Sequence, residues 1–244
     1  MPLNNALCSL QIIDKVRVRK KKNKEKKMEV TSVRRIKSVC VFCGSNPGKD
    51  KEFVNIAHHL GRVLAEREIR LVYGGGSLGL MGCVATAAHL GGGKVLGVIP
   101  SPLSTSKPIG KTLGDEVMVF CMHQRMNIMI ANADAFIALP GGFETLEELF
   151  QITSWSQQNF HQKPIGILNV NGFYDSLFCF LDHSVEKRFI SQATRQSLVT
   201  ATTPEQLLDQ LNAFVPQRDP AMAPRNWEQG SSSKKQKFDL TLSL

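Results

Sequence analysis

The sequence predicts an α/β fold, a Rossmann-like doubly wound parallel sheet with helices on both faces. Three observations support this prediction. Short apolar runs of strand length alternate with segments of helical periodicity, the runs lack the alternation of a half-exposed strand, and three of them end in glycine-rich loops. Continuous apolar runs are typical of parallel strands, because helices cover both faces of the sheet. Ligands bind such sheets where loops leave the carboxyl ends of the strands.

The predicted elements extend from residue 39 to residue 214. We expect strands at 39–43, 70–73, 95–99, 117–121, 135–139 and 165–169. We expect helices at 53–66, 78–90, 125–131, 145–157, 174–186 and 204–214. Strands separated by single helices indicate one parallel sheet, since a parallel neighbour requires a crossover connection.

The positive charge of the chain lies at its N-terminus. The 244 residues carry a formal net charge of +9, but residues 1–37 hold 12 Lys and Arg against 3 acids, so the remainder is neutral. We therefore predict a basic, disordered extension (1–35), a Rossmann-like domain (36–216) and a polar flexible tail (217–244). The extension is expected to be solvated, with nuclear import or RNA contact as the alternative. Elsewhere we expect no nucleic-acid partner.

Two further features bear on location and metal content. No apolar run approaches the roughly 18 residues of a membrane span, and the N-terminus lacks the order of a secretory signal. We therefore expect a cytosolic protein without membrane contact, and a nuclear one if the basic run directs import. The six cysteines fit no disulfide framework. Cys40 and Cys43 have zinc-knuckle spacing but no second pair, so we interpret them as buried strand thiols and expect no metal.

Three glycine-containing loops, at 43–46, 73–82 and 140–142, follow predicted strands and indicate an anion site. Gly74, Gly76 and Gly79 have the spacing of a dinucleotide-binding fingerprint. The acid that would hold the ribose of a dinucleotide is missing, because no Asp or Glu lies between residues 69 and 114. The Lys-Ser/Thr pair of a P-loop is absent as well. The loops therefore predict a mononucleotide-like site without a nicotinamide cofactor.

The stretch 136–150 predicts a buried strand, a Pro-Gly-Gly turn and a helix that begins at Thr145. Two interpretations of Glu148 remain open. The pattern favours a capping box with Thr145, whereas the alternative is a carboxylate held beside a bound sugar. Arg125 opens another predicted helix near the same edge, where it suits a phosphate or carboxylate, or is simply solvated.

Together these motifs closely resemble those of the plant LONELY GUY family, in order and without large gaps over about residues 36–214. The motifs that carry the resemblance are Cys43-Gly-Ser, Tyr73-Gly-Gly-Gly-Ser-x-Gly-Leu-Met-Gly82, Gly97-Val-Ile-Pro100, Met122-His-Gln-Arg125, Ala133-Asp-Ala-Phe-Ile-Ala-Leu-Pro-Gly-Gly142 and Thr145-Leu-Glu-Glu148. Members of this family are cytokinin riboside 5'-monophosphate phosphoribohydrolases. The resemblance implies a homodimeric Rossmann-like enzyme without metal or organic cofactor, which converts N6-prenylated AMP to the free cytokinin base and ribose 5-phosphate.

The family is often labelled lysine decarboxylase, but a pyridoxal-dependent decarboxylase does not fit this sequence. Between Lys111 and Lys187 the only lysine is Lys163, which stands before Pro164 without a cofactor-site pattern.

The resemblance also implies roles for individual residues. Glu148 is the expected catalytic carboxylate, and Arg125 is expected to stabilise charge and orient groups, since its pKa is too high for proton donation. Ser154 falls where the family has a substrate-contacting threonine. The expected substrate-binding residues are Ser45, Gly74, Gly75, Gly76, Gly79, Lys107, Met126, Gly142, Phe143, Glu144, Thr145, Leu146, Glu147 and Ser154.

Three positions depart from the family pattern. Glu144 stands where the family has Gly, Met126 replaces a Lys, and Lys107 stands where a substrate-binding Glu is usual. Glu144 is expected to strain the backbone if that Gly has a positive φ, and its carboxylate is expected to repel a phosphate. These departures leave an alternative open, a catalytically impaired homologue that binds nucleotide or only dimerises.

Overall fold

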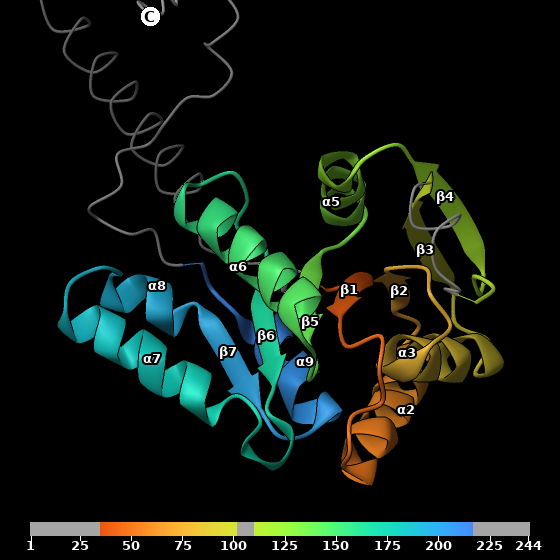
Figure 1. The fold of residues 1–244 in the computed structure, drawn as a ribbon, viewed down its shortest axis with the longest axis horizontal. Helices are drawn as coiled ribbons and strands as arrows, with labels where there is room; N and C mark the ends of the chain where they lie inside the picture. Colours follow the sequence, from red (N-terminus) through yellow and green to blue (C-terminus); the bar gives the residue numbers. More distant parts are fainter. Residues whose placement is uncertain (1–34, 102–109, 217–244) are drawn as a thin grey trace, which may run out of the picture. The chain divides into compact units, whose positions relative to one another are not determined.

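The computed structural model describes residues 35–101 and 110–216, and every structural statement below concerns those residues. The chain divides after Ile36 into two units, and the fold is that of the second. Its centre is a seven-stranded sheet in which all neighbouring strands are parallel, in the order β4-β3-β2-β1-β5-β6-β7 (Figure 1). The predicted doubly wound α/β fold is confirmed. The basic extension and the polar tail lie outside the described residues.

The strands are β1 (Ser38–Phe42), β2 (Arg70–Tyr73), β3 (Val95–Pro100), β4 (Asp115–Val119), β5 (Ala135–Ala138), β6 (Ile165–Leu168) and β7 (Leu198–Ala201). The prediction located the first six but placed β4 two residues too late, at 117–121. It missed β7 altogether. Both errors fall on the edge strands, where residues of β4 and β7 are exposed and the apolar run that marks a buried strand is broken.

The helices are α2 (Lys51–Glu66), α3 (Gly79–Leu90), α5 (Met122–Ala131), α6 (Phe143–Gln157), α7 (Asp175–Glu186), α8 (Gln192–Gln196) and α9 (Pro204–Ala213), with a 3-10 turn η1 (Val170–Gly172). The short α8 was not predicted, because five residues are too few to show helical periodicity. The helix starts predicted at residues 53, 125 and 145 lie two to three residues after the observed starts of α2, α5 and α6. None of the helices in the described ranges combines the length and apolarity that a membrane crossing requires.

Helices cover both faces of the sheet. On one face, buried side chains of α5, α6 and α7 form a single core cluster with alternate residues of the strands, such as Ile165 and Ile167 of β6. Gly166, between them, faces the other side, where a Cβ would lie 3.0 Å from Leu207 of α9. The buried thiols predicted for Cys40 and Cys43 are confirmed, since both are buried and unpaired by disulfides.

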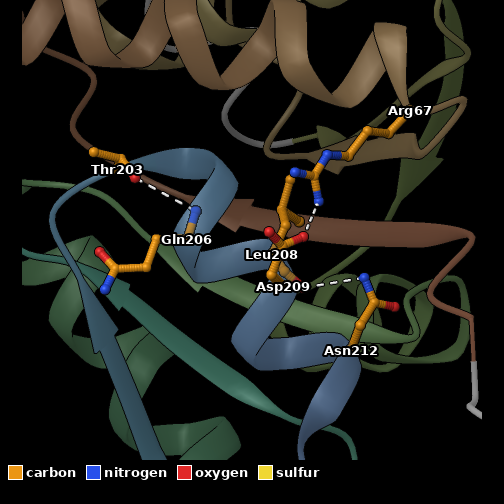
Figure 2. A network of polar contacts seen from close by, with 6 residues as sticks. All are labelled: Arg67, Thr203, Gln206, Leu208, Asp209 and Asn212. Atoms are coloured by element: carbon orange, nitrogen blue, oxygen red, sulfur yellow. Dashed lines mark hydrogen bonds and ion pairs between the residues drawn. The ribbon is translucent and has the colours of Figure 1, made fainter.

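An ion pair joins α9 to the end of α2, and further polar contacts lie within α9 and its cap (Figure 2). Nη1 of Arg67 lies 2.5 Å from Oδ1 of Asp209, and Thr203 caps α9 by accepting a hydrogen bond from the backbone N–H of Gln206. Both members of the ion pair are partly exposed, so it contributes at most about 1 kcal/mol. The apolar residues that α9 buries against the sheet therefore dominate its attachment.

The strand order places the switch point of the sheet between β1 and β5. From β1 the chain moves outward to β4, then returns to the other side of β1 with β5 and continues to β7. The loops that follow β1 and β5 therefore diverge and leave a crevice at the carboxyl ends of these strands. Two of the three predicted glycine loops border this crevice.

Close packing of α2 on α3 depends on Gly61. A Cβ there would lie 2.4 Å from the carbonyl oxygen of Val84 and 2.7 Å from Cβ of Ala87, so the two helices would have to separate.

We predict that Gly61→Ala lowers the free energy of unfolding, measured with urea, by about 1–3 kcal/mol. The higher helix propensity of Ala favours the variant by only about 1 kcal/mol, and the clash involves backbone that cannot rotate away. Arg62→Ala, at the neighbouring exposed position, is the control and should change stability little. Equal or greater stability of Gly61→Ala would contradict this account of the packing.

Candidate active site

The glycine loops after β1, β2 and β5 are joined through their backbones. The N–H of Gly44 donates to the carbonyl of Pro140 over 3.0 Å, and the N–H of Leu80 donates to the carbonyl of Gly44 over 3.0 Å. A Cβ at Gly79 would lie 2.3 Å from the carbonyl carbon of Ser45. Glycine is therefore required at residue 79 for the close approach of two loops. The three loops together form one continuous backbone surface, here called the floor of the candidate site.

The helix α6 begins at this floor without a side-chain cap. Its N-cap is Gly142, and its first internal hydrogen bond runs from the N–H of Leu146 to the carbonyl of Gly142, over 3.0 Å. The N–H groups of Phe143, Glu144 and Thr145 therefore have no acceptor within the helix. Together with the helix dipole, equivalent to about half a positive charge, they make this turn an anion site.

The predicted capping box is wrong. Thr145 is the third residue of α6 rather than its N-cap, and its Oγ1 lies against Gly141, where a Cβ would be only 2.1 Å away. The predicted helix start is two residues too late, because the pattern assigns Phe143 and Glu144 to the turn that follows Pro140-Gly-Gly142. Phe143 and Glu144 are already helical.

A cavity of about 410 Å³ lies in front of this turn. Part of its lining is formed by the glycine loops and the first turn of α6. Another part is apolar and includes the rings of Phe53 and Phe173, which meet edge to face with their centroids 5.6 Å apart. A 2.6 Å hydrogen bond from Asn171 in η1 to Asp50, the N-cap of α2, joins the two segments that carry these rings. The lining residues are Gly44, Ser45, Asn46, Pro47, Gly48, Phe53, Leu80, Pro140, Gly141, Gly142, Phe143, Glu144, Thr145 and Phe173.

A buried ion pair joins α5 to α6. Nη1 of Arg125 lies 2.6 Å from Oε1 of Glu148, and the two residues are only 8% and 5% exposed. Nε of Arg125 donates to the carbonyl of Val98, at the end of β3, over 3.3 Å. A Cβ at Gly74 would lie 2.5 Å from Nη2 of Arg125, so the glycine makes room for the guanidinium. Four elements therefore fix the pair, and the solvated alternative for Arg125 is excluded.

Burial dominates the electrostatics of Glu148. The pKa of this carboxyl is raised from 4.5 to about 7, chiefly by loss of water; Arg125 lowers it, and the charges of Glu147 and Glu144 add smaller increases. A carboxyl with a pKa near neutrality exchanges a proton readily at physiological pH. Arg125 remains a fixed cation beside it. The pair can therefore stabilise developing positive charge, orient a water molecule and take up a proton.

The structure assembles part of the predicted site around the cavity. Ser45, Gly142, Phe143, Glu144 and Thr145 line it. The glycines of the second loop shape the floor instead: Gly74 accommodates Arg125, Gly79 accommodates Ser45, and Gly75 has a φ of +84°, which favours glycine. Gly76 is buried in the same loop.

Other predicted residues lie elsewhere. Met126 is 1% exposed and belongs to the core cluster, because one step along a helix turns the side chain by about 100° away from that of Arg125. Leu146 packs against the same core, and Glu147 is exposed without lining the cavity. Ser154 accepts a hydrogen bond from Gln158 and borders a separate apolar groove. Lys107 lies outside the described residues.

The expected backbone strain at Glu144 does not occur. The non-glycine residues with positive φ in the described ranges are Glu68, Asn159, Asn171 and Arg188. Glu144 is the second residue of α6 and has an ordinary place in the first helical turn. The strained backbone, one of the reasons for expecting an impaired homologue, therefore does not apply.

Sequence reasoning missed two tyrosines that support the loops. Oη of Tyr174 donates to the carbonyl of Leu139, just before the Pro-Gly-Gly turn, over 2.6 Å. Oη of Tyr73 donates to the carbonyl of Gly75 over 3.3 Å and accepts from the N–H of Leu113 over 3.0 Å. Two of these three contacts join residues 35 and 40 positions apart, so no local pattern could have found them.

The doubly wound sheet, with a helix start at its switch point, defines the class of Rossmann-like α/β proteins. Solved structures agree with this fold. The molybdenum cofactor binding protein from Rippkaea orientalis is 21% identical, with a TM-score of 0.55, and the match covers 74% of this chain and 98% of that one. The molybdenum cofactor carrier protein from Chlamydomonas reinhardtii is 19% identical, with a TM-score of 0.53, over 72% and 98% of the two chains.

Sequence comparison gives the family. The family model described as "Possible lysine decarboxylase" matches residues 81–211. The chain is 48% identical to the "Probable cytokinin riboside 5'-monophosphate phosphoribohydrolase LOGL6" of Oryza sativa subsp. japonica, over 80% of this chain and 78% of the relative. It is 47% identical to the "Cytokinin riboside 5'-monophosphate phosphoribohydrolase LOG7" of Arabidopsis thaliana, over 80% and 90%. The chain therefore belongs to the LONELY GUY (LOG) family, and the predicted membership is confirmed.

We predict that the stability of the folded chain falls as the pH rises from about 4.5 to about 7. Glu148 has a pKa of about 7 when folded, against an ordinary value of 4.5, so the folded state holds an extra proton in this interval. The fall attributable to Glu148, measured by urea unfolding at pH 5 and pH 8, should reach about 3 kcal/mol at most. Glu148→Gln cannot titrate and should lose this component. An identical pH dependence in both proteins would contradict the assignment.

Proposed function

We propose that this chain hydrolyses the N-glycosidic bond of cytokinin riboside 5'-monophosphates, N6-prenylated adenosine monophosphates, and releases the free base and ribose 5-phosphate. The observation that carries the proposal is the buried Arg125–Glu148 pair, whose carboxylate belongs to the second turn of a helix with an uncapped start. The identity of 45–48% to phosphoribohydrolases of that name supports the same reaction.

The first turn of α6 binds the 5'-phosphate. The unpaired N–H groups of Phe143, Glu144 and Thr145 donate to phosphate oxygens, and the helix dipole favours the negative charge. Glu148 follows Thr145 by three residues, which is about 4.5 Å along the helix axis. A phosphate held at the helix start therefore brings the attached ribose towards the carboxylate.

Glu148 acts on the anomeric carbon. Cleavage of an N-glycosidic bond develops positive charge on the ribose ring, and a buried carboxylate stabilises that charge more strongly than water does. Water supplies a hydroxyl group to the anomeric carbon and a proton to the departing base, and Glu148 orients this water. Arg125 positions the Glu148 carboxylate and opposes its protonation.

We further propose that the chain works as a homodimer, as the family resemblance implies. Phe143, which lines the cavity, is 92% exposed, and Phe120 is 83% exposed, so a partner subunit would find apolar side chains to cover. A cytosolic location is consistent with the free thiols of Cys40 and Cys43. Nuclear import or nucleic-acid contact through the basic extension concerns residues outside the described ranges and stays a prediction.

We predict that Glu148→Gln lowers kcat for base release from isopentenyladenosine 5'-monophosphate by about 100-fold or more, because the amide carries no charge to stabilise the ring cation. The free base is quantified by chromatography. Glu66→Gln removes an equal charge at the far end of α2 and is the matched control, with activity like that of the unaltered chain. Full activity of Glu148→Gln would remove the carboxylate from the mechanism.

A further inference from the structure

The anion site in the first turn of α6 contains a carboxylate of its own. Glu144 is the second residue of the helix and lines the cavity, and its side chain is exposed. It forms no hydrogen bond or ion pair with any residue that the structure describes. Among the residues that the structure describes, no fixed cation pairs with this carboxylate at the cavity.

The surroundings of Glu144 leave it free to face a ligand. A Cβ at Gly142 would meet no atom within 4 Å, so the cavity is open beside the helix start. The charge of Glu144 also acts on the carboxyl of Glu148, because it is one of the causes that raise the pKa of Glu148. A phosphate bound at the helix start would experience the same repulsion.

Two opposing effects therefore act on a bound phosphate. The free N–H groups and the dipole of α6 attract it, with a strength equivalent to about half a positive charge. The same helix start also favours an acidic side chain in its first turn, so Glu144 competes for the positive potential that would hold the phosphate. The carboxylate repels the phosphate in addition.

We propose that Glu144 is a specificity-determining residue that weakens the preference of this site for phosphorylated over unphosphorylated nucleosides. The inference rests on the proposed function, because it assigns the phosphate of that substrate to the first turn of α6. With Glu144 present, ribose 5-phosphate binds weakly and leaves readily after cleavage. The binding of a riboside without phosphate does not depend on this residue.

The test compares the affinities of two ligands by titration calorimetry, ribose 5-phosphate and isopentenyladenosine. Glu144→Gln should bind ribose 5-phosphate about tenfold more tightly than the unaltered chain, as expected for one like-charge contact near a protein surface. Glu144→Lys should bind it more tightly still. Both variants should bind isopentenyladenosine with unchanged affinity, and the gain for ribose 5-phosphate should shrink in high salt.

Glu66→Gln again serves as the charge-matched control. It lies thirteen residues beyond Phe53 on α2, about 20 Å from the cavity, and should leave both affinities unchanged. Circular dichroism and urea unfolding establish that each variant is folded.

Equal affinity of the unaltered chain and Glu144→Gln for ribose 5-phosphate would overturn the proposal. An equal gain for isopentenyladenosine would also overturn it, because the effect would then not concern phosphate. Failure of every variant to bind ribose 5-phosphate would remove the anion site itself. Tighter binding by Glu144→Gln, in a chain that releases no base from cytokinin nucleotides, would support the role of Glu144 and refute the proposed hydrolase activity.

Discussion

The ion pair between Arg125 and Glu148 is the interaction on which the site depends. Two charges buried to this degree are stable only together, because either one alone would lose its hydration without compensation. Their contact fixes the start of α5 against the middle of α6. It also explains why the loop after β2 has a glycine at residue 74, where any side chain would displace the guanidinium. The same pair therefore holds α5 against α6 and fixes the position of the Glu148 carboxylate.

In the proposed mechanism, the first two turns of α6 serve both phosphate binding and catalysis. Its start has no side-chain cap, which leaves N–H groups for a phosphate, and its sixth residue is the buried carboxylate. The strand order places this helix start at the switch point of the sheet. The fold therefore places an attractive potential for anions and a carboxylate of raised pKa on the same helix. In our proposal one nucleotide spans both, and Glu144 weakens the hold on its phosphate.

Much of this arrangement could be predicted from the sequence. Apolar runs located the buried strands, and glycines after three of them located the floor of the site, because both depend on local patterns. The two edge elements β7 and α8 gave no such pattern. The direction of side chains was also predicted wrongly, since Met126 enters the core although it adjoins Arg125. The backbone conformation of Glu144 was a further error, because this residue is helical rather than strained. The pairing of Arg125 with Glu148 joins residues 23 positions apart and required the structure.

The central claim is that one nucleotide spans the start of α6 and the Arg125–Glu148 pair. A crystal structure of Glu148→Gln with isopentenyladenosine 5'-monophosphate tests it most directly, since this variant should retain the uncleaved substrate. We expect phosphate oxygens within hydrogen-bond distance of the backbone N–H groups of Glu144 and Thr145, and the anomeric carbon beside residue 148. A nucleotide whose phosphate lies away from α6, or whose ribose lies far from residue 148, would contradict the account.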